Sequence, residues 1–235
     1  MISTPIYYYE SIPSTNAQAK KMILDGVKEG VLLAKHQSAG RGRLGRTFFS
    51  GNGIFMSIIL APEKIPFDVG FLTSAVAVAV CRAISEQGFD VGIKWVNDIY
   101  LDGKKICGIL AEAVSLQAKM LGYVVGIGIN VGESDFPDDI REIAAALSLD
   151  EQQKKALFFR VIENLETVLT ENPQELLQYL KEKSTVLGKP IRFFGATDGE
   201  GIAIDLDTNG GLIVALDNGE KRTLTGGEIS VRVQK

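Results

Sequence analysis

The sequence predicts an α+β fold, with a mixed or antiparallel sheet covered by helices and a small C-terminal β barrel. Two strand-like segments flank Asp102-Gly103, which is a hairpin signal. One long apolar helix is expected over 67–86, where it would lie under a sheet. Beyond residue 188, short strands are separated by Asp-Gly and Asn-Gly turns. This order of elements differs from the strand–helix alternation of a Rossmann fold.

The first domain is expected to cover 1–187. Ser14, Thr15 and Asn16 precede its first helix, where such side chains cap the N-terminus, and Gly26 ends that helix. The expected strands are 6–10, 31–35, 54–60, 93–101, 104–112 and 121–130. The expected helices are 17–24, 67–86, 138–146, 152–170 and 174–184. The second domain, 188–235, is expected to place barrel strands at 191–195, 200–206, 212–216, 220–225 and 229–233.

Composition narrows the class of protein. The chain has 235 residues, a net charge of −4 and an apolar fraction of 46%, which are ordinary values for a globular protein. Without an overall positive charge, neither DNA nor a membrane surface is an expected partner. The longest apolar run, 69–81, is too short and interrupted to span a membrane. The N-terminus lacks a signal-like apolar segment, so we expect a soluble cytoplasmic protein.

The cysteines and the histidine argue against several kinds of site. Cys81 and Cys107 lack metal-type spacing and have apolar neighbours, so buried free thiols in a reducing cytosol are favoured over a single disulfide. His36 is the only histidine, which argues against a histidine-based metal cluster or a Ser-His-Asp triad. We therefore interpret His36 as structural.

An arginine- and glycine-rich loop, 40–46, is the strongest local signal of a ligand site. Its glycines allow the backbone to form a nest for an anion, and each arginine offers a planar fork of donors to carboxylate or phosphate. Gly-Arg alternation also occurs in disordered RNA-binding tails and in solvated loops. This loop is short, internal and flanked by strand-like sequence. A small anionic ligand is therefore the favoured interpretation.

Five motifs in order, each weak alone, give a specific signal. They are Ser14-Thr15-Asn16, the segment 37–46, Lys94-Trp95-Val96-Asn97-Asp98, the segment 105–112 and Gly126-Ile127-Gly128-Ile129-Asn130. Together they closely resemble biotin–protein ligases, that is, biotin–[acetyl-CoA-carboxylase] ligases. The tail, with Gly226-Gly227-Glu228-Ile229-Ser230, resembles the small C-terminal barrel of that family. Because the catalytic part begins almost at Met1, the likeness is to the monofunctional type without an N-terminal DNA-binding domain.

The resemblance implies a catalytic domain similar to class II aminoacyl-tRNA synthetases and an SH3-like C-terminal barrel. It also implies a reaction in which biotin and ATP give biotinyl-5′-AMP and pyrophosphate. Biotin then passes to one lysine of a biotin carboxyl carrier protein. ATP and biotin are thus the implied substrates, and Mg²⁺ is implied by the ATP chemistry. The resemblance does not say which carrier protein is the acceptor. It also leaves open whether the chain forms a homodimer.

The resemblance implies a role for each residue that matches a functional position in the motifs of the family. The implied catalytic residues are Lys105, Arg43 and Asp98, with Asp98 a candidate for accepting the proton of the acceptor lysine. The implied biotin-binding residues are Ser14, Thr15, Asn16, Gln37, Gly40, Arg41, Gly42, Arg43, Lys105, Gly108 and Leu110. The implied ATP- or adenylate-binding residues are Arg41, Arg43, Arg46, Trp95, Asn97, Lys105 and Asn130. No metal ligand is assigned, and Glu112 is only a candidate.

These residue types suit the implied chemistry. A carboxylate that attacks a phosphate brings two anions together, so cations must be in place beforehand. A ureido ring has two N–H donors and one carbonyl, which neutral hydroxyls and amides can match. The loop 40–46 is expected to close over biotin and its adenylate. No clear counterpart of an adenine-stacking aromatic is found over 136–146.

One departure and two rival interpretations remain. Val96 stands where the family usually has proline, which affects local geometry and removes no chemical group. A lipoate or octanoate ligase shares the acyl-to-lysine chemistry but has no need of Gln37 and the Ser14-Thr15-Asn16 set. A nucleic-acid-binding module would use the arginine loop and the barrel, and the acidic composition argues against it.

Overall fold

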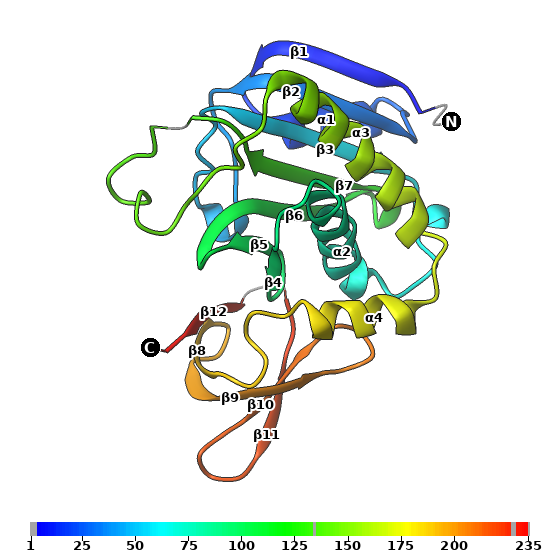
Figure 1. Ribbon diagram of the computed structural model, residues 1–235. Coiled ribbons are helices and arrows are strands. Elements are labelled where there is room, and N and C mark those ends of the chain that lie inside the picture. Colours follow the sequence, from blue (N-terminus) through cyan, green and yellow to red (C-terminus); the bar gives the residue numbers. More distant parts are fainter. Residues whose placement is uncertain (1–3, 134, 227–228, 235) are drawn as a thin grey trace.

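A seven-stranded mixed sheet forms the larger part of the molecule (Figure 1). The computed structural model describes residues 4–133, 135–226 and 229–234, so Gly227 and Glu228 of the C-terminal motif lie outside the described residues. The strand order is β1-β2-β3-β7-β6-β5-β4, in which β1 is parallel to β2 and the other neighbours are antiparallel. The bounds are β1 Ile6–Ile12, β2 Gly30–Gln37, β3 Gly53–Leu60, β4 Gly92–Lys94, β5 Asp98–Leu101, β6 Lys104–Leu116 and β7 Lys119–Asn130.

Helices cover both faces of this sheet. Residues Ala19 and Ile23 of α1 pack with Leu32, Ile59 and Val124 on one face. The helices α2 and α3 pack on the opposite face. Successive side chains of a strand point to opposite faces, so the neighbours of the residues that contact α1 point toward α2 and α3. The helices are α1 Thr15–Leu24, α2 Leu72–Ser85, α3 Glu151–Val168 and α4 Pro173–Glu182, with short 3₁₀ turns η1 Arg43–Gly45, η2 Pro62–Lys64 and η3 Val69–Phe71. Ser14 caps α1, because its side chain accepts a hydrogen bond from the Ala17 N–H.

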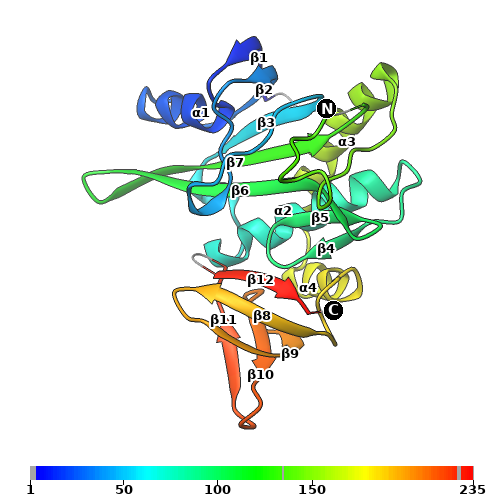
Figure 2. The same ribbon diagram turned by 90° about the vertical axis from the view of Figure 1, so that its left-hand side faces the viewer.

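The hairpin at Asp102-Gly103 and the mixed sheet confirm the predicted α+β class. Both residues have positive φ, 49° and 77°, which the turn requires. The long hairpin of β6 and β7 continues well past the other strands, and Figure 2 shows it extending beyond the rest of the sheet. Cys81 and Cys107 are buried free cysteines, as expected. No helix among the described residues is long and apolar enough to cross a membrane.

Two predicted elements are wrong. The segment 138–146 forms successive turns and no α-helix, because its end is drawn into main-chain bonds with the large sheet. The N–H of Lys105 donates to Ile143 O (2.8 Å), and the N–H of Ala145 donates to Lys105 O (2.9 Å). The predicted strand 93–101 is two antiparallel strands, β4 and β5, that are joined by a turn over 95–97. Asp98 is therefore the first residue of β5, whereas the predicted strand 93–101 would place it in the interior of a strand.

A second, five-stranded antiparallel sheet forms the C-terminal part. Its strands are β8 Pro190–Gly195, β9 Gly199–Leu206, β10 Leu212–Ala215, β11 Lys221–Leu224 and β12 Ile229–Val233, in the order β11-β10-β9-β8-β12. Alternate residues such as Ile191, Phe193, Leu212 and Val214 are buried in its core. The end strands β11 and β12 are not paired with each other among the described residues.

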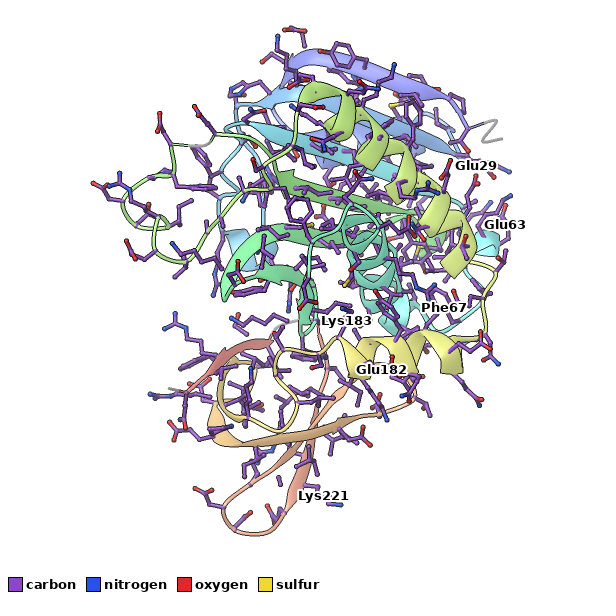
Figure 3. The ribbon with its side chains drawn as sticks, viewed as in Figure 1. Glu29, Glu63, Phe67, Glu182, Lys183 and Lys221 are labelled. Atoms are coloured by element: carbon purple, nitrogen blue, oxygen red, sulfur yellow. The ribbon has the colours of Figure 1, made fainter. Side chains whose placement is uncertain are left out.

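The two sheets are joined around the turn between β4 and β5. Trp95 Nε1 donates to the carbonyl of Gly210 in the β9–β10 turn (2.8 Å). The N–H of Ile93 donates to Lys183 O (2.7 Å) just after α4, and Figure 3 shows Lys183 between the large sheet and the smaller one. The Trp95–Val96 peptide bond is cis. The turn between β4 and β5 thus contacts the smaller, C-terminal sheet directly.

Candidate active site

A cavity of about 370 Å³ lies on the α1 face of the large sheet. Its walls come from the start of α1, the arginine loop, the turn between β4 and β5, the strands β6 and β7, the segment 136–144 and β12. The structure brings nearly all of the predicted site residues to this one cavity. The predicted residues that line it are Ser14, Thr15, Asn16, Gln37, Arg41, Gly42, Arg43, Arg46, Trp95, Asn97, Asp98, Lys105, Gly108, Leu110 and Asn130.

Gly40 is the predicted site residue that does not line the cavity. It closes the base of the arginine loop, where its carbonyl accepts a hydrogen bond from the Phe48 N–H (3.0 Å). A Cβ at this position would lie 2.7 Å from Phe48 O, so only glycine fits. Gly45 supplies the one positive φ of the loop, 71°. The loop is held as a narrow hairpin, with the Gly42 N–H donating to Arg46 O (2.7 Å).

Glycines on two neighbouring strands form the floor of the cavity. The β-sheet register places Gly108 opposite Gly128 and Leu110 opposite Gly126, all on the same face. A Cβ at Gly126 would lie 2.2 Å from Asn16 Oδ1, and one at Gly128 would lie 2.5 Å from the ring of Phe48. A Cβ at Gly108 would lie 3.0 Å from Lys105 Nζ. The glycines therefore leave room for side chains to lie flat on the sheet.

Neutral polar groups surround the position above Gly126. Gln37 Oε1 accepts from the Thr15 N–H (2.8 Å) and from Thr15 Oγ1 (3.1 Å). Ser57 Oγ lies 2.7 Å from Thr15 Oγ1 and donates to Asn16 Oδ1 (2.6 Å). Ser57 is fully buried and lies opposite Gly126 in the register of β3 and β7. This end of the cavity therefore holds a network of neutral hydroxyl and amide groups.

Cations and one carboxylate surround the position above Gly108. Lys105 Nζ lies 2.6 Å from Asp98 Oδ1. Lys94 Nζ donates to the hydroxyl of Tyr100 (3.1 Å). Burial lowers the pKa of Lys94, and the charge of Asp98 opposes that shift. Asp98 is thus the electrostatic partner of the cations that line this end.

The arginine loop reaches across the cavity to the C-terminal sheet. Arg43 donates to Asn97 Oδ1 (3.0 Å), to the carbonyl of Ile229 (3.0 Å) and to the carbonyl of Gly226. Arg46 donates to Ser230 Oγ (3.4 Å). Burial lowers the pKa of Arg43, and Asp98 again opposes the shift. The loop, the β4–β5 turn and β12 therefore meet at one guanidinium group.

Several residues in and behind the cavity lining were not identified from the sequence. Phe136 packs against Phe49 with ring centroids 5.7 Å apart, and both line the cavity. The predicted residue Asn130, at the end of β7, holds the segment 136–145, because its Nδ2 donates to Ala145 O (3.1 Å). Phe48, Ser57 and the residues of β12 were also missed. The one available signal was Ser57, which is a lone hydroxyl in the apolar run 54–60.

Glu112 does not fit its candidate role as a metal ligand. It lies outside the cavity lining, and its carboxylate oxygens bind Lys20 Nζ (2.5 Å) and Asn16 Nδ2 (2.8 Å). Among the described residues, no group of three or more His, Cys, Asp and Glu side chains could hold a metal ion. Asp98 is the one carboxylate in the described lining.

Comparison with models of known protein families shows which family this chain belongs to. The model of the biotin/lipoate A/B protein ligase family matches residues 8–130, which is more than half of the chain. The chain belongs to this family. The model of the biotin protein ligase C-terminal domain matches residues 186–232, the segment that forms the smaller sheet.

Individual relatives cover different shares of the chain. The bifunctional ligase/repressor BirA of Bacillus subtilis is 41% identical over 149 residues, which is 61% of this chain and 46% of that protein. The chain thus spans about half the length of that relative. The biotin–[acetyl-CoA-carboxylase] ligase of Mycobacterium tuberculosis is 30% identical over 220 residues, which is 85% of this chain and 79% of that protein.

Solved structures of family members superpose on nearly the whole chain. The biotin protein ligase from Aquifex aeolicus in complex with biotin and ATP gives a TM-score of 0.84 at 26% identity, over 98% of this chain and 99% of that chain. The biotin protein ligase from Leishmania major in complex with biotinyl-5-AMP gives a TM-score of 0.67 at 23% identity, over 95% and 100% of the two chains. The second likeness shows the shared fold alone.

Proposed function

We propose that this chain is a biotin–protein ligase. In the first step, a carboxylate oxygen of biotin attacks the α-phosphorus of ATP, and pyrophosphate leaves. In the second step, the neutral amine of one lysine on a biotin carboxyl carrier protein attacks the acyl carbon of biotinyl-5′-AMP. AMP leaves, and the amine loses a proton. Residues 1–187 would form the catalytic domain, and 188–235 the C-terminal domain.

One observation carries the proposal: a single cavity has a neutral polar set above Gly126 and a cationic set above Gly108. Gly108 lies opposite Gly128, which is two residues along β7 from Gly126. Two residues of strand span about 7 Å. A ligand with a neutral hydrogen-bonding head and a carboxylate at the end of a short apolar chain fits this layout, and biotin is such a ligand.

The cationic set supports the first step. Lys105, Arg43 and Arg46 would offset the repulsion between the biotin carboxylate and the phosphates, and each of them has a protein contact at this end of the cavity. ATP would bring Mg²⁺, and Asp98 is the carboxylate of the described cavity lining that could contact it. Phe48, which lies over Gly128, would flank the apolar chain of biotin and keep water from the acyl group.

Asp98 supports the second step. An amine attacks an acyl-adenylate only in its neutral form, so a base near the acyl carbon is needed. Asp98 lies beside Lys105 at the carboxyl end of the proposed ligand and is partly exposed, with 21% of its side chain accessible. It is therefore the group we assign to take the proton. Both thiols are free and buried, which supports the cytoplasmic location that carrier biotinylation would need.

The proposal is tested by pyrophosphate exchange with different acids. The protein is incubated with ATP, labelled pyrophosphate and one of three acids, which are biotin, lipoate and octanoate. The rate at which label enters ATP is then measured. Biotin is expected to support exchange at far lower concentration than the other two, because only biotin can use the polar set above Gly126. Faster exchange with lipoate or octanoate would assign the chain to another branch of the family.

A further inference from the structure

The amide of Asn16 is held by three described protein groups. Its Nδ2 donates to Glu112 Oε2 (2.8 Å) and to the carbonyl of Leu110 (3.3 Å). Its Oδ1 accepts from Ser57 Oγ (2.6 Å). An amide nitrogen has two hydrogens and an amide oxygen has two lone pairs. Both hydrogens are therefore used by the protein, and one lone pair of Oδ1 is what Asn16 can offer to a ligand.

This orientation of the amide is dictated by its neighbours. Glu112 and the Leu110 carbonyl are acceptors, so the NH₂ group must face them. If the amide were reversed, Oδ1 would lie within hydrogen-bond distance of two other oxygens and would be repelled by both. Ser57 does not decide the matter, because a hydroxyl can donate or accept. The carboxylate of Glu112 is thus the stronger of the two groups that set the polarity of Asn16.

Lys20 in turn keeps Glu112 in place. Lys20 Nζ lies 2.5 Å from Glu112 Oε1, one helical turn after Asn16 on α1. Glu112 lies on β6, two residues after Leu110 and on the same face of the strand. The pair is partly exposed, with 35% and 26% of the two side chains accessible, and it lies outside the cavity lining. Neither residue can therefore act by touching the ligand.

We propose that Glu112, held by Lys20, is a positioning residue that fixes Asn16 with its oxygen available to the ligand. The site then selects a ring that presents an N–H group at that point. Gln37 has the opposite polarity, because its Oε1 is used by Thr15 and its Nε2 points toward Ser50 Oγ (3.4 Å). A cyclic urea, which has both N–H groups and a carbonyl, matches one acceptor and one donor. This inference rests on the proposed function and adds the residue pair that sets its specificity.

The Glu112→Gln substitution tests this role with little change in volume. Lys20 carries only donors, so the carbonyl oxygen of the introduced amide would turn toward it, and the introduced NH₂ group would face Asn16. Asn16 must then reverse or leave two donors facing each other. Reversal removes the preference for a ring N–H at that point, and repulsion between the two donors weakens it by displacing Asn16.

The measurement compares biotin with its two cyclic carbamate analogues, in each of which one ring N–H is replaced by oxygen. KM values for the three acids are obtained from pyrophosphate exchange. The wild type is expected to reject one isomer more strongly than the other, because its ring oxygen would face Asn16 Oδ1. In E112Q the KM ratio between that isomer and biotin is expected to fall about tenfold, the equivalent of one hydrogen bond. General damage to the fold would raise all KM values together and leave the ratio unchanged.

Two further variants make the test specific. In the double variant K20M/E112Q, the carbonyl of the introduced amide is free to face Asn16, so the wild-type ratio is expected to return. E10Q is a matched control, because Glu10 forms an ion pair of the same length with Lys35 (2.5 Å) that is exposed on β1 and β2. It is expected to leave all KM values unchanged.

The outcomes separate this inference from the proposed function. If wild-type protein shows no biotin-dependent exchange, the proposed function is wrong. If biotin supports exchange but E112Q keeps the wild-type ratio, the function stands and the role of Glu112 is wrong. A lowered ratio in E112Q that the double variant does not restore would contradict the part assigned to Lys20.

Discussion

Lys105 Nζ and Asp98 Oδ1 lie 2.6 Å apart at the point where the two proposed steps take place. In the proposed reaction, Lys105 is the cation for the first step, in which negative charge accumulates. Asp98 is there assigned as the base for the second step, in which a proton must leave an amine. The two groups therefore lie in direct contact, although each is assigned to a different step.

Replacing Asp98 by asparagine is expected to affect the second step more than the first. Without the carboxylate, transfer from preformed biotinyl-5′-AMP to a carrier domain should slow by about 10²-fold at neutral pH. Transfer should then recover as the pH is raised, because the neutral fraction of a free lysine increases about tenfold per pH unit below its pKa of about 10.4. Single-turnover transfer between pH 7 and 9 measures this. Equal rates and equal pH slopes for wild type and D98N would remove Asp98 from the mechanism.

Replacing Ser57 by alanine is expected to weaken biotin binding with the fold intact. Thr15 Oγ1 and Asn16 Oδ1 would both lose their contact with Ser57 Oγ. The loss of about 1–2 kcal/mol corresponds to a rise of roughly tenfold in KM for biotin, with KM for ATP unchanged. Ser74, a buried serine outside the cavity lining, provides the matched control S74A. A similar KM for biotin in S57A and S74A would show that the network does not bind the ligand.

Replacing Trp95 by phenylalanine is expected to loosen the junction between the two sheets. The hydrogen bond from Trp95 Nε1 to Gly210 O would be lost, and a buried carbonyl would be left without that donor. The free energy of unfolding should fall by about 1–3 kcal/mol, as measured by urea denaturation. Y179F removes the longer contact from the Tyr179 hydroxyl to Cys81 Sγ (3.8 Å) and should cost less. An equal loss in both variants would argue against a special role of the junction.

Biotin is expected to protect the arginine loop from trypsin. Arg41, Arg43 and Arg46 line the cavity, so a bound ligand would hold them and shield the loop. Cleavage at Lys221 serves as an internal reference, because Figure 3 shows this residue on the smaller sheet, far from the large one. Mass spectrometry of timed digests gives the rate at each position. Loop cleavage that is equally fast with and without biotin would contradict closure over the ligand.

The sequence was sufficient to predict the fold class and most of the residues that line the cavity, because the motifs are short and their chemistry is local. The strand signals place Gly108 and Gly128 on two predicted strands, 104–112 and 121–130, but they do not predict that the two strands are neighbours. The function of these glycines as a floor for Phe48 and Lys105 could not be predicted either, because it depends on how side chains from other positions lie over them.

The errors have a common physical origin. The segment 138–146 has helix-like apolar spacing, yet its backbone bonds to Lys105 on β6 and follows the sheet instead. In the same way, the contact of Arg43 with the carbonyls of Gly226 and Ile229 joins residues more than 180 positions apart. Tertiary contacts of this kind leave no local pattern, and they decided both the wrong helix and the missed contribution of β12.

The most direct test is ATP-dependent biotinylation of a biotin carboxyl carrier domain, with wild-type protein and K105A compared by intact-mass spectrometry of the carrier. Lys104, the neighbour of Lys105 that lies outside the cavity lining, provides the control K104A. Wild type and K104A are expected to add one biotinyl group to the carrier, and K105A is expected to be slower by about 10²–10³-fold with an unchanged unfolding midpoint. A carrier that gains no biotin with wild-type protein, or gains it as fast with K105A, would contradict the proposed function or the role of Lys105.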